Sequence, residues 1–206
     1  MLLVGEGDDL EPPDSFLKKK PKSDVLNLVG DYRFLTVGYF VSLHAEENGC
    51  KVFPQTKDAL DIYRAAVFIE RLKKSGIKVP EFKIIYKPEP ETCVLAPMNP
   101  FSKNSVKIVK NDYQYIKAFK KIGIGKYPVV QLKADKVEEV KIFLNKADKT
   151  EFDWLARAIF KEFGVPLGKV LIADDYKPFY FMPIEKKEIR LDLIFEELKN
   201  ENRLFC

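Results

Sequence analysis

The stretch from Asp31 to Pro54 constrains the fold more than any other part of the chain, because it reads as a helix that leads directly into a strand. Gly49 ends the predicted helix, and Val52-Phe53 forms a short apolar run closed by Pro54. A helix that enters an apolar strand through a glycine is typical of layered α/β proteins. The predicted apolar stripe of this helix consists of Tyr39, Phe40, Leu43 and Ala45.

Hydrophobic periodicity and turn residues predict the remaining elements. Short strands are expected over residues 2–5, 24–29, 81–86, 92–95, 105–109, 127–132, 137–144, 170–173 and 179–182. Further helices are expected over 56–75, 111–121, 151–163 and 191–200, with Asn111 as one N-cap, a capping box of Thr150 and Asp153, and Gly164 as a stop. The turn at 87–91 is predicted to pair the strands on either side of it.

This order of elements indicates an α/β to α+β fold with two small lobes. We predict an N-terminal α/β lobe over residues 1–80 and a second lobe over residues 81–206. A chain of 206 residues is long enough for a real core, and its length alone fits one compact domain or two small lobes.

Cysteine and charge content exclude several classes of protein. Cys50, Cys93 and Cys206 are odd in number and form no CxxC pair, which favours a reducing compartment and argues against a zinc site. Neither a signal peptide nor a run of about 20 apolar residues is present, so we expect a cytoplasmic protein that does not enter a membrane. Charged residues make up 32% of the chain, a balance typical of proteins from hot environments.

The middle of the chain is strongly basic. Residues 99–149 contain 12 lysines and 5 acidic residues, a net charge of +7, whereas the rest of the chain carries −3. Tyr113, Tyr115 and Tyr127 lie among these lysines, and such a pattern can bind RNA through phosphate contacts and base stacking. The alternative is a solvated lysine face above core tyrosines. The candidate nucleic-acid-binding residues are Lys103, Lys107, Lys110, Lys117, Lys120, Lys121 and Lys126.

Two pairs of polar residues are further candidates. Asp31 and Arg33 follow a predicted buried strand, and ligands gather at the carboxyl ends of strands in α/β sheets. They are therefore a candidate pocket, and the alternative is a structural ion pair. Asp174 and Asp175 could bind a metal, but adjacent acids at a hairpin tip are usually turn residues.

Several segments, in this order, resemble the RimK-like branch of the ATP-grasp family. They are GYFVSLHAEENGCKVFP, LKKSGIKVP, VLAP, NPFSKNSVKIV, YPVVQ, VKIFLN and LARAIFKEFGVPLGKVLIADDYKPFYFMPIE. The resemblance is closest to the α+β domain that precedes RimK-like ATP-grasp modules in larger proteins, here as a stand-alone form. It implies that the second lobe is ATP-grasp-like.

The resemblance also implies where ATP and metal would bind. ATP-grasp ligases hold ATP with two lysines, and these positions fall near Arg64-Ala65 and at Ala96. The phosphate loop would be Asn99 to Ser105, which contains no glycine. The metal-binding positions fall at Leu171, Pro183 and Glu185, of which Glu185 alone can contact a cation. The ATP and metal motifs are therefore degenerate.

We therefore expect a non-catalytic binding or accessory protein with no catalytic residues, no metal and no cofactor. Its partner would be a separate RimK-like ligase, or RNA or a ribonucleoprotein bound by the basic segment. The alternative is an ATP-dependent carboxylate–amine ligase whose active-site residues have been relocated.

Overall fold

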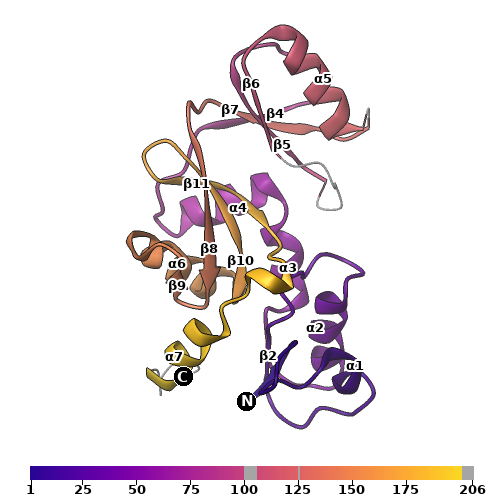
Figure 1. Ribbon diagram of the computed structural model, residues 1–206. Helices are drawn as coiled ribbons and strands as arrows, with labels where there is room; N and C mark the ends of the chain where they lie inside the picture. Colours follow the sequence, from indigo (N-terminus) through magenta and orange to yellow (C-terminus); the bar gives the residue numbers. More distant parts are fainter. Residues whose placement is uncertain (100–105, 125, 201–206) are drawn as a thin grey trace. The chain divides into compact units, whose positions relative to one another are not determined.

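The computed structural model describes residues 1–99, 106–124 and 126–200 of the chain. The chain contains both helices and strands, which alternate singly as far as β3 (Val52–Phe53) and occur in runs after it, in agreement with the α/β to α+β prediction (Figure 1). The chain divides into two compact units, neither of them continuous in sequence: residues 1–60, 140–169 and 182–206 form the first, and residues 61–139 and 170–181 form the second. The predicted division at residue 80 differs from this one and stays a prediction. No helix in the described ranges is long and apolar enough to cross a membrane.

The first unit contains a parallel sheet of order β1-β2-β3. Its strands are β1 (Leu2–Val4), β2 (Val25–Asn27) and β3 (Val52–Phe53), and the helices α1 (Pro13–Phe16) and α2 (Val37–Glu47) join them. Valines from all three strands pack with side chains of both helices in one apolar core. The prediction that a helix leads into a strand over residues 31–54 is confirmed.

The buried face of α2 agrees with the predicted stripe at Ala45 but differs from it elsewhere. Gly38, Val41, Ser42 and Ala45 are buried, whereas Phe40 is 41% exposed. Polar contacts turn the helix this way, because the buried Asn27 amide donates to the Gly38 carbonyl at 2.7 Å and to Ser42 Oγ at 3.0 Å. Gly38 also permits close approach, since a Cβ there would lie 2.2 Å from the Asp31 carbonyl oxygen.

A second sheet has the order β11-β10-β8-β9. Its strands are β8 (Val137–Phe143), β9 (Lys146–Ala147), β10 (Leu167–Ala173) and β11 (Lys177–Met182). The boundaries between the two units fall inside β8, β10 and β11. Between β9 and β10 the chain forms the 3-10 helix η1 (Thr150–Phe152) and the helix α6 (Asp153–Phe163). After β11 it forms the 3-10 helix η2 (Lys186–Glu188) and the helix α7 (Leu191–Asn200).

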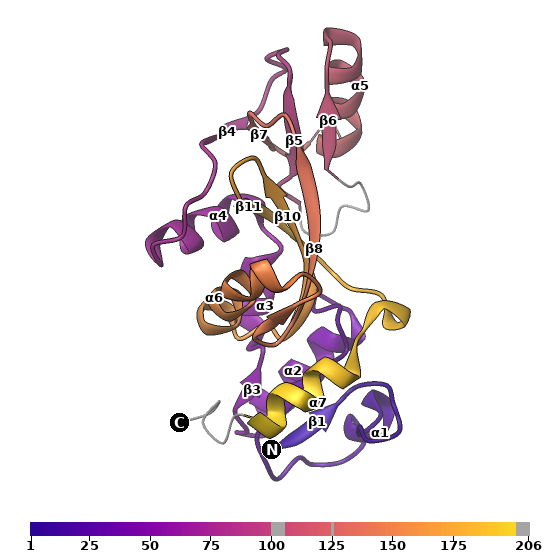
Figure 2. The same cartoon turned by 60° about the vertical axis from the view of Figure 1, so that its left-hand side comes forward.

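The second unit contains an antiparallel sheet of order β4-β7-β5-β6, with α5 (Asp112–Gly123) against one face (Figure 2). The strands are β4 (Phe82–Ile85), β5 (Cys93–Pro97), β6 (Lys107–Val109) and β7 (Val129–Leu132). The predicted pairing of β4 with β5 is wrong, because β7 lies between them and pairs with both. β7 comes after β6 and α5 in the sequence, yet it lies between β4 and β5, which are neighbours in the sequence.

Helix ends test the capping predictions. The Asn111 side chain caps α5 by accepting from the Gln114 N–H at 2.9 Å, and Gly164 ends α6 in the left-handed conformation, both as predicted. The predicted capping box at residue 150 is wrong, because Asp153 accepts from the Ala147 N–H at 2.9 Å instead. The single helix predicted over 56–75 is two helices, α3 (Thr56–Ile62) and α4 (Ala65–Lys74).

Candidate functional site

Ala96, the position at which the resemblance places a phosphate-binding lysine, lies on the antiparallel sheet of order β4-β7-β5-β6, called the small sheet below, on the face opposite α5. The register pairs Ala96 with Val130 and Val94 with Leu132, and residues that pair across antiparallel strands share a face. All four side chains are apolar and at most 2% exposed. The face that carries Ala96 therefore offers side-chain methyl groups where a ligase would offer an ammonium group.

At the other position for a phosphate-binding lysine, the chain has an arginine that already forms an ion pair. Arg64 precedes α4, and its guanidinium forms an ion pair with Asp61 at 3.4 Å. The second oxygen of Asp61 pairs with Arg71 at 3.2 Å. The next residue, Ala65, is fully buried.

The three positions that would hold a metal are placed as follows. Leu171 lies on β10 and is 8% exposed, and Pro183 follows β11. Glu185 is the N-cap of η2, where it forms a capping box with Glu188, and it pairs with Lys187 at 2.8 Å. Across the described residues, no group of three or more His, Cys, Asp or Glu side chains is arranged to hold a metal ion.

The structure brings Asp31 and Arg33 together as a two-pronged ion pair. The Arg33 guanidinium donates through Nε to Oδ1 of Asp31 at 2.9 Å and through Nη2 to Oδ2 at 2.6 Å. Each side chain is 29% exposed. This parallel geometry is the strong form of an arginine–carboxylate contact, so the pair already satisfies the carboxylate and a ligand site there stays a prediction.

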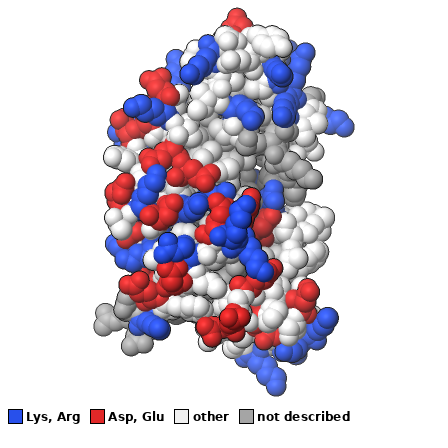
Figure 3. All heavy atoms as spheres, in the orientation of Figure 1, with Lys and Arg blue, Asp and Glu red and all other residues white. Residues whose placement is uncertain are grey.

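Four of the candidate lysines line one groove between β6 and α5. The groove has a volume of about 520 Å³, and these lysines are Lys107, Lys110, Lys117 and Lys121. Lys120 and Lys126 are exposed but lie outside its lining, and Lys103 falls outside the described residues. Figure 3 shows blue side chains in the upper part of the molecule, where Figure 1 places β6 and α5. The sequence therefore identified most of a basic surface, but not the groove.

The tyrosines of the basic segment divide between surface and core. Tyr113 and Tyr127 are 76% and 48% exposed, whereas Tyr115 is fully buried beneath α5 and cannot stack on a base. None of the three lines the groove, whose remaining lining includes Ile108, Val109 and Ala118. Gln114 also lines the groove, which thus combines lysines with aliphatic side chains and one amide.

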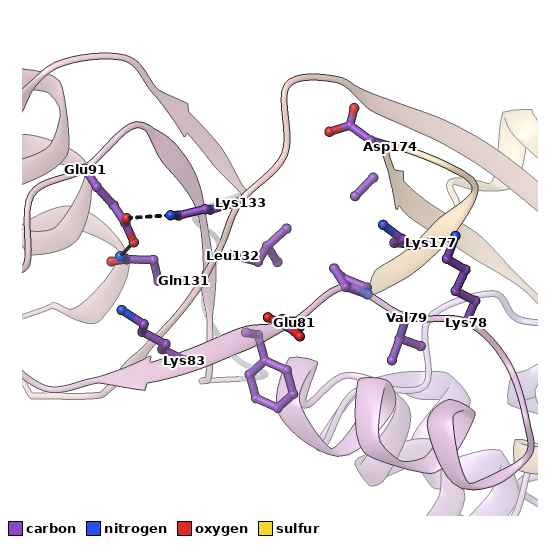
Figure 4. Close-up of a pocket in the computed structure, with 13 residues that line it drawn as sticks. Lys78, Val79, Glu81, Lys83, Glu91, Gln131, Leu132, Lys133, Asp174 and Lys177 are labelled. Carbon is purple, nitrogen blue, oxygen red and sulfur yellow. Dashed lines mark hydrogen bonds and ion pairs between the residues drawn. The ribbon is translucent and has the colours of Figure 1, made fainter.

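A second pocket of about 600 Å³ lies within the second unit, where β4, β7, residues 78–81 and the tip of the β10–β11 hairpin meet (Figure 4). Its lining includes residues from both faces of this sheet, because Lys83 and Gln131 pair on the α5 side, whereas Phe82 and Leu132 pair on the Ala96 side. Side chains of both charges line the pocket, which suits a polar ligand with acidic and basic groups. These side chains are Lys78, Lys83, Lys133, Lys177, Glu81, Glu91 and Asp174.

A buried polar chain supports one wall of this pocket. The Tyr115 hydroxyl donates to the Gln131 carbonyl oxygen, and the Gln131 amide donates to Glu91. Glu91 in turn lies 3.7 Å from the Lys133 ammonium group. Gln131 is 2% exposed, so Tyr115 and Glu91 satisfy an amide that would otherwise be costly to bury. Burial, aided by the charge of Glu91, raises the pKa of the Cys93 thiol to about 12.

The acid pair at the hairpin tip serves the backbone and nearby lysines. Asp174 accepts from the Asp135 and Lys136 N–H groups at 2.7 and 2.8 Å, and these hydrogen bonds lower the pKa of its carboxyl. Asp175 pairs with Lys177 at 3.2 Å. The structure supports the interpretation of both acids as turn residues.

Sequence reasoning missed the pocket of Figure 4. Its polar wall joins Glu91 to Gln131, 40 residues apart, and depends on β7 lying between β4 and β5. The charged turn at residues 87–91 was visible in the sequence, but its position relative to β7 was not.

Solved structures with a similar fold are ATP-grasp ligases. The D-alanine–D-alanine ligase of Helicobacter pylori matches with a TM-score of 0.56 and 12% identity over 89% of this chain and 71% of its own. The D-alanine–D-alanine ligase of Bacillus anthracis complexed with ATP matches with a TM-score of 0.54 and 16% identity, over 84% of this chain and 72% of its own. The ATP-grasp ligase PsnB complexed with minimal precursor matches with a TM-score of 0.54 and 12% identity, over 96% of this chain and 98% of its own. At these identities the likeness shows the fold alone.

The comparison with curated proteins gives no match. The family model described as the RimK-like ATP-grasp N-terminal domain matches residues 13–190, which is most of the chain. This agrees with the resemblance that the sequence segments indicated. The chain belongs to the RimK-like ATP-grasp N-terminal domain family.

Proposed function

We propose that this chain is a non-catalytic binding or accessory domain built on the ATP-grasp fold. The observation that carries the proposal is the buried apolar face formed by Val94, Ala96, Val130 and Leu132, each at most 2% exposed. Leu171 supports it from the metal-binding end, because an alkyl side chain replaces a carboxylate there.

The physical reason is the cost of burying charge without partners. A phosphate group that reached Ala96 would lose water and gain no hydrogen bond from the side chains of this face. A magnesium ion needs several oxygen ligands at once, and Glu185 already caps η2 and pairs with Lys187. Phosphoryl transfer depends almost entirely on such positioning and charge stabilisation.

Calorimetric titration with Mg-ATP tests this proposal, with the Bacillus anthracis ligase, whose structure contains ATP, as the positive control. We expect no saturable heat from this chain at concentrations that saturate the control. A dissociation constant in the low micromolar range, about −8 kcal/mol, would overturn the proposal in favour of a ligase with relocated residues.

A second observation favours a particular binding surface. Four lysines line the groove between β6 and α5, and such a concentration of positive charge attracts an anionic macromolecule. RNA or a ribonucleoprotein is one proposed ligand. An acidic surface of a protein partner is the other, and a separate RimK-like ligase is a reasonable partner because the family is described as a domain N-terminal to such enzymes.

Salt dependence tests the RNA candidate. If the lysine surface contacts phosphates, the affinity for a single-stranded RNA should fall with a slope of about −0.7 in log K against log salt for each phosphate neutralised. The triple variant Lys117→Glu, Lys120→Glu, Lys121→Glu should abolish binding while its thermal stability changes little, because all three side chains are exposed. RNA binding that the triple variant retains would exclude this surface as the RNA site.

A further inference from the structure

The groove between β6 and α5 lies at an edge of the small sheet. In the order β4-β7-β5-β6, β6 is the terminal strand, and among the described residues it pairs with β5 and with no other strand. The outer edge of such a strand presents backbone N–H and C=O groups to a further strand. Figure 2 shows α5 running alongside β6, so a strand added at this edge would pass next to the helix.

The lysines of α5 are spaced to match such a strand. Lys117 and Lys121 are four residues apart on one helical face, which separates them by about 6 Å along the axis. Alternate side chains of an extended strand are about 6.8 Å apart on one face. Two successive same-face side chains of an added strand would therefore each meet one of these lysines.

Lys107 adds a third positive charge on the same face. It pairs with Leu95, which belongs to the core beneath α5, and so it lies on the α5 side of β6. Among the described residues, the charged side chains that line the groove are all lysines, beside one glutamine, Gln114. Acidic residues of an added strand therefore suit the positions that point toward α5.

The opposite face of β6 favours apolar residues. Ile108 pairs with Val94 on this face and is 47% exposed. A neighbouring strand would cover it with the side chains that alternate with the acidic ones. None of the described residues that line the groove is aromatic, so the groove is a poor platform for the base stacking that single-stranded nucleic acids use. The groove thus fits a peptide better than RNA.

We propose that β6 accepts an extended acidic segment of a protein partner as a fifth strand of the small sheet, with acidic residues toward α5 and apolar residues on the Ile108 side. The inference rests on the proposed binding role of the lysine surface, but not on the loss of ATP binding. It names the partner chemistry as alternating acidic and apolar residues in an extended chain.

Fluorescence anisotropy with a labelled octapeptide of alternating Glu and Val tests this proposal against a peptide of the same composition with its four Glu residues in one block. The groove variant Lys117→Glu, Lys121→Glu is compared with Lys120→Glu, Lys126→Glu, which changes the net charge equally but lies outside the groove lining. We expect the groove variant to weaken binding of the alternating peptide by about tenfold or more, and the matched variant by less than about threefold. The blocked peptide should bind about tenfold more weakly.

Three results would overturn the proposal. Equal losses in the two variants would indicate general charge attraction. Displacement of the peptide by an oligouridylate that binds more tightly would assign the surface to nucleic acid. Absence of binding at millimolar peptide would leave the lysines as residues that keep an exposed edge from pairing. If the chain bound Mg-ATP and also bound the alternating peptide as expected, the proposed loss of ATP binding would be wrong and the proposed peptide site would stand. The failure of one proposal can therefore be distinguished from the failure of the other.

Discussion

Replacing Glu188 by Gln should weaken the first unit at neutral pH, because this carboxylate joins η2 to two strands. Its Oε1 lies 3.1 Å from the Lys141 ammonium group on β8, and its Oε2 lies 3.2 Å from the Lys169 ammonium group on β10. The Glu185 N–H also donates to Oε2 at 3.2 Å. The Glu188 and Lys169 side chains are only 18% and 16% exposed, so water screens the pair weakly.

The pKa of Glu188 sets the magnitude. Burial is the largest influence and raises the pKa, but hydrogen bonds from Lys141, the Glu185 backbone and Lys169 together outweigh it and lower the pKa from 4.5 to about 2. At about 1.4 kcal/mol per pKa unit, the charged form contributes at most about 3–4 kcal/mol to folding. Because the folded pKa lies below the unfolded value, this contribution is complete above pH 4.5 and is lost as the pH falls toward 2.

Urea unfolding at a series of pH values measures this contribution. At pH 7 the Glu188→Gln variant should lose about 2–3 kcal/mol of unfolding free energy. Its stability should also fall less steeply than that of the natural chain below pH 4.5. The control Glu196→Gln, at an exposed position on α7, should stay within about 0.5 kcal/mol. Equal stability of Glu188→Gln and the natural chain at pH 7, or parallel pH profiles, would show that the Glu188 carboxylate does not stabilise the folded chain.

Three further substitutions or modifications probe the two units. Tyr115→Phe removes the donor to the buried Gln131 oxygen and should cost about 1–3 kcal/mol by urea unfolding, and a neutral result would show that the chain is not stabilising. Gly38→Ala places a Cβ 2.2 Å from a backbone oxygen and should cost more than about 2 kcal/mol, whereas Gly49→Ala, with open space around it but a positive φ, should cost about 1 kcal/mol. In a Cys206→Ser background, an aromatic disulfide reagent at pH 8 should modify Cys50 and spare Cys93. Cys93 is 1% exposed and its pKa is raised to about 12. Rapid modification of both thiols would contradict the burial of Cys93.

Local signals predicted the elements that local interactions determine. Asn111 and Gly164 mark helix ends because capping and the left-handed conformation depend on a few neighbouring residues. The buried face of α2 was mispredicted because Asn27, ten residues before the helix, fixes it through Gly38 and Ser42. Hydrophobic periodicity alone would place Phe40 inside, and it cannot detect a buried amide that bonds a distant helix.

The same distinction holds for the candidate site. Lys117 and Lys121 were visible as a helical pair, since their spacing is local. Their groove also requires β6 as an edge strand, and the pocket of Figure 4 requires β7 between β4 and β5. Both features are products of strand order. Pairings between strands distant in sequence follow from the packing of the whole unit, which no short stretch of sequence encodes.

The free energy of unfolding with and without Mg-ATP shows most directly whether this chain binds the nucleotide, because any ligand that binds the folded chain in preference to the unfolded one stabilises it whatever its heat of binding. A ligand at a hundredfold excess over its dissociation constant adds about 2.7 kcal/mol. We expect 1 mM Mg-ATP to change the unfolding free energy by less than about 0.5 kcal/mol, since the side chains of Ala96 and Leu171 offer no ligand to phosphate or metal. An increase of about 2.7 kcal/mol, equivalent to a dissociation constant near 10 μM, would contradict it.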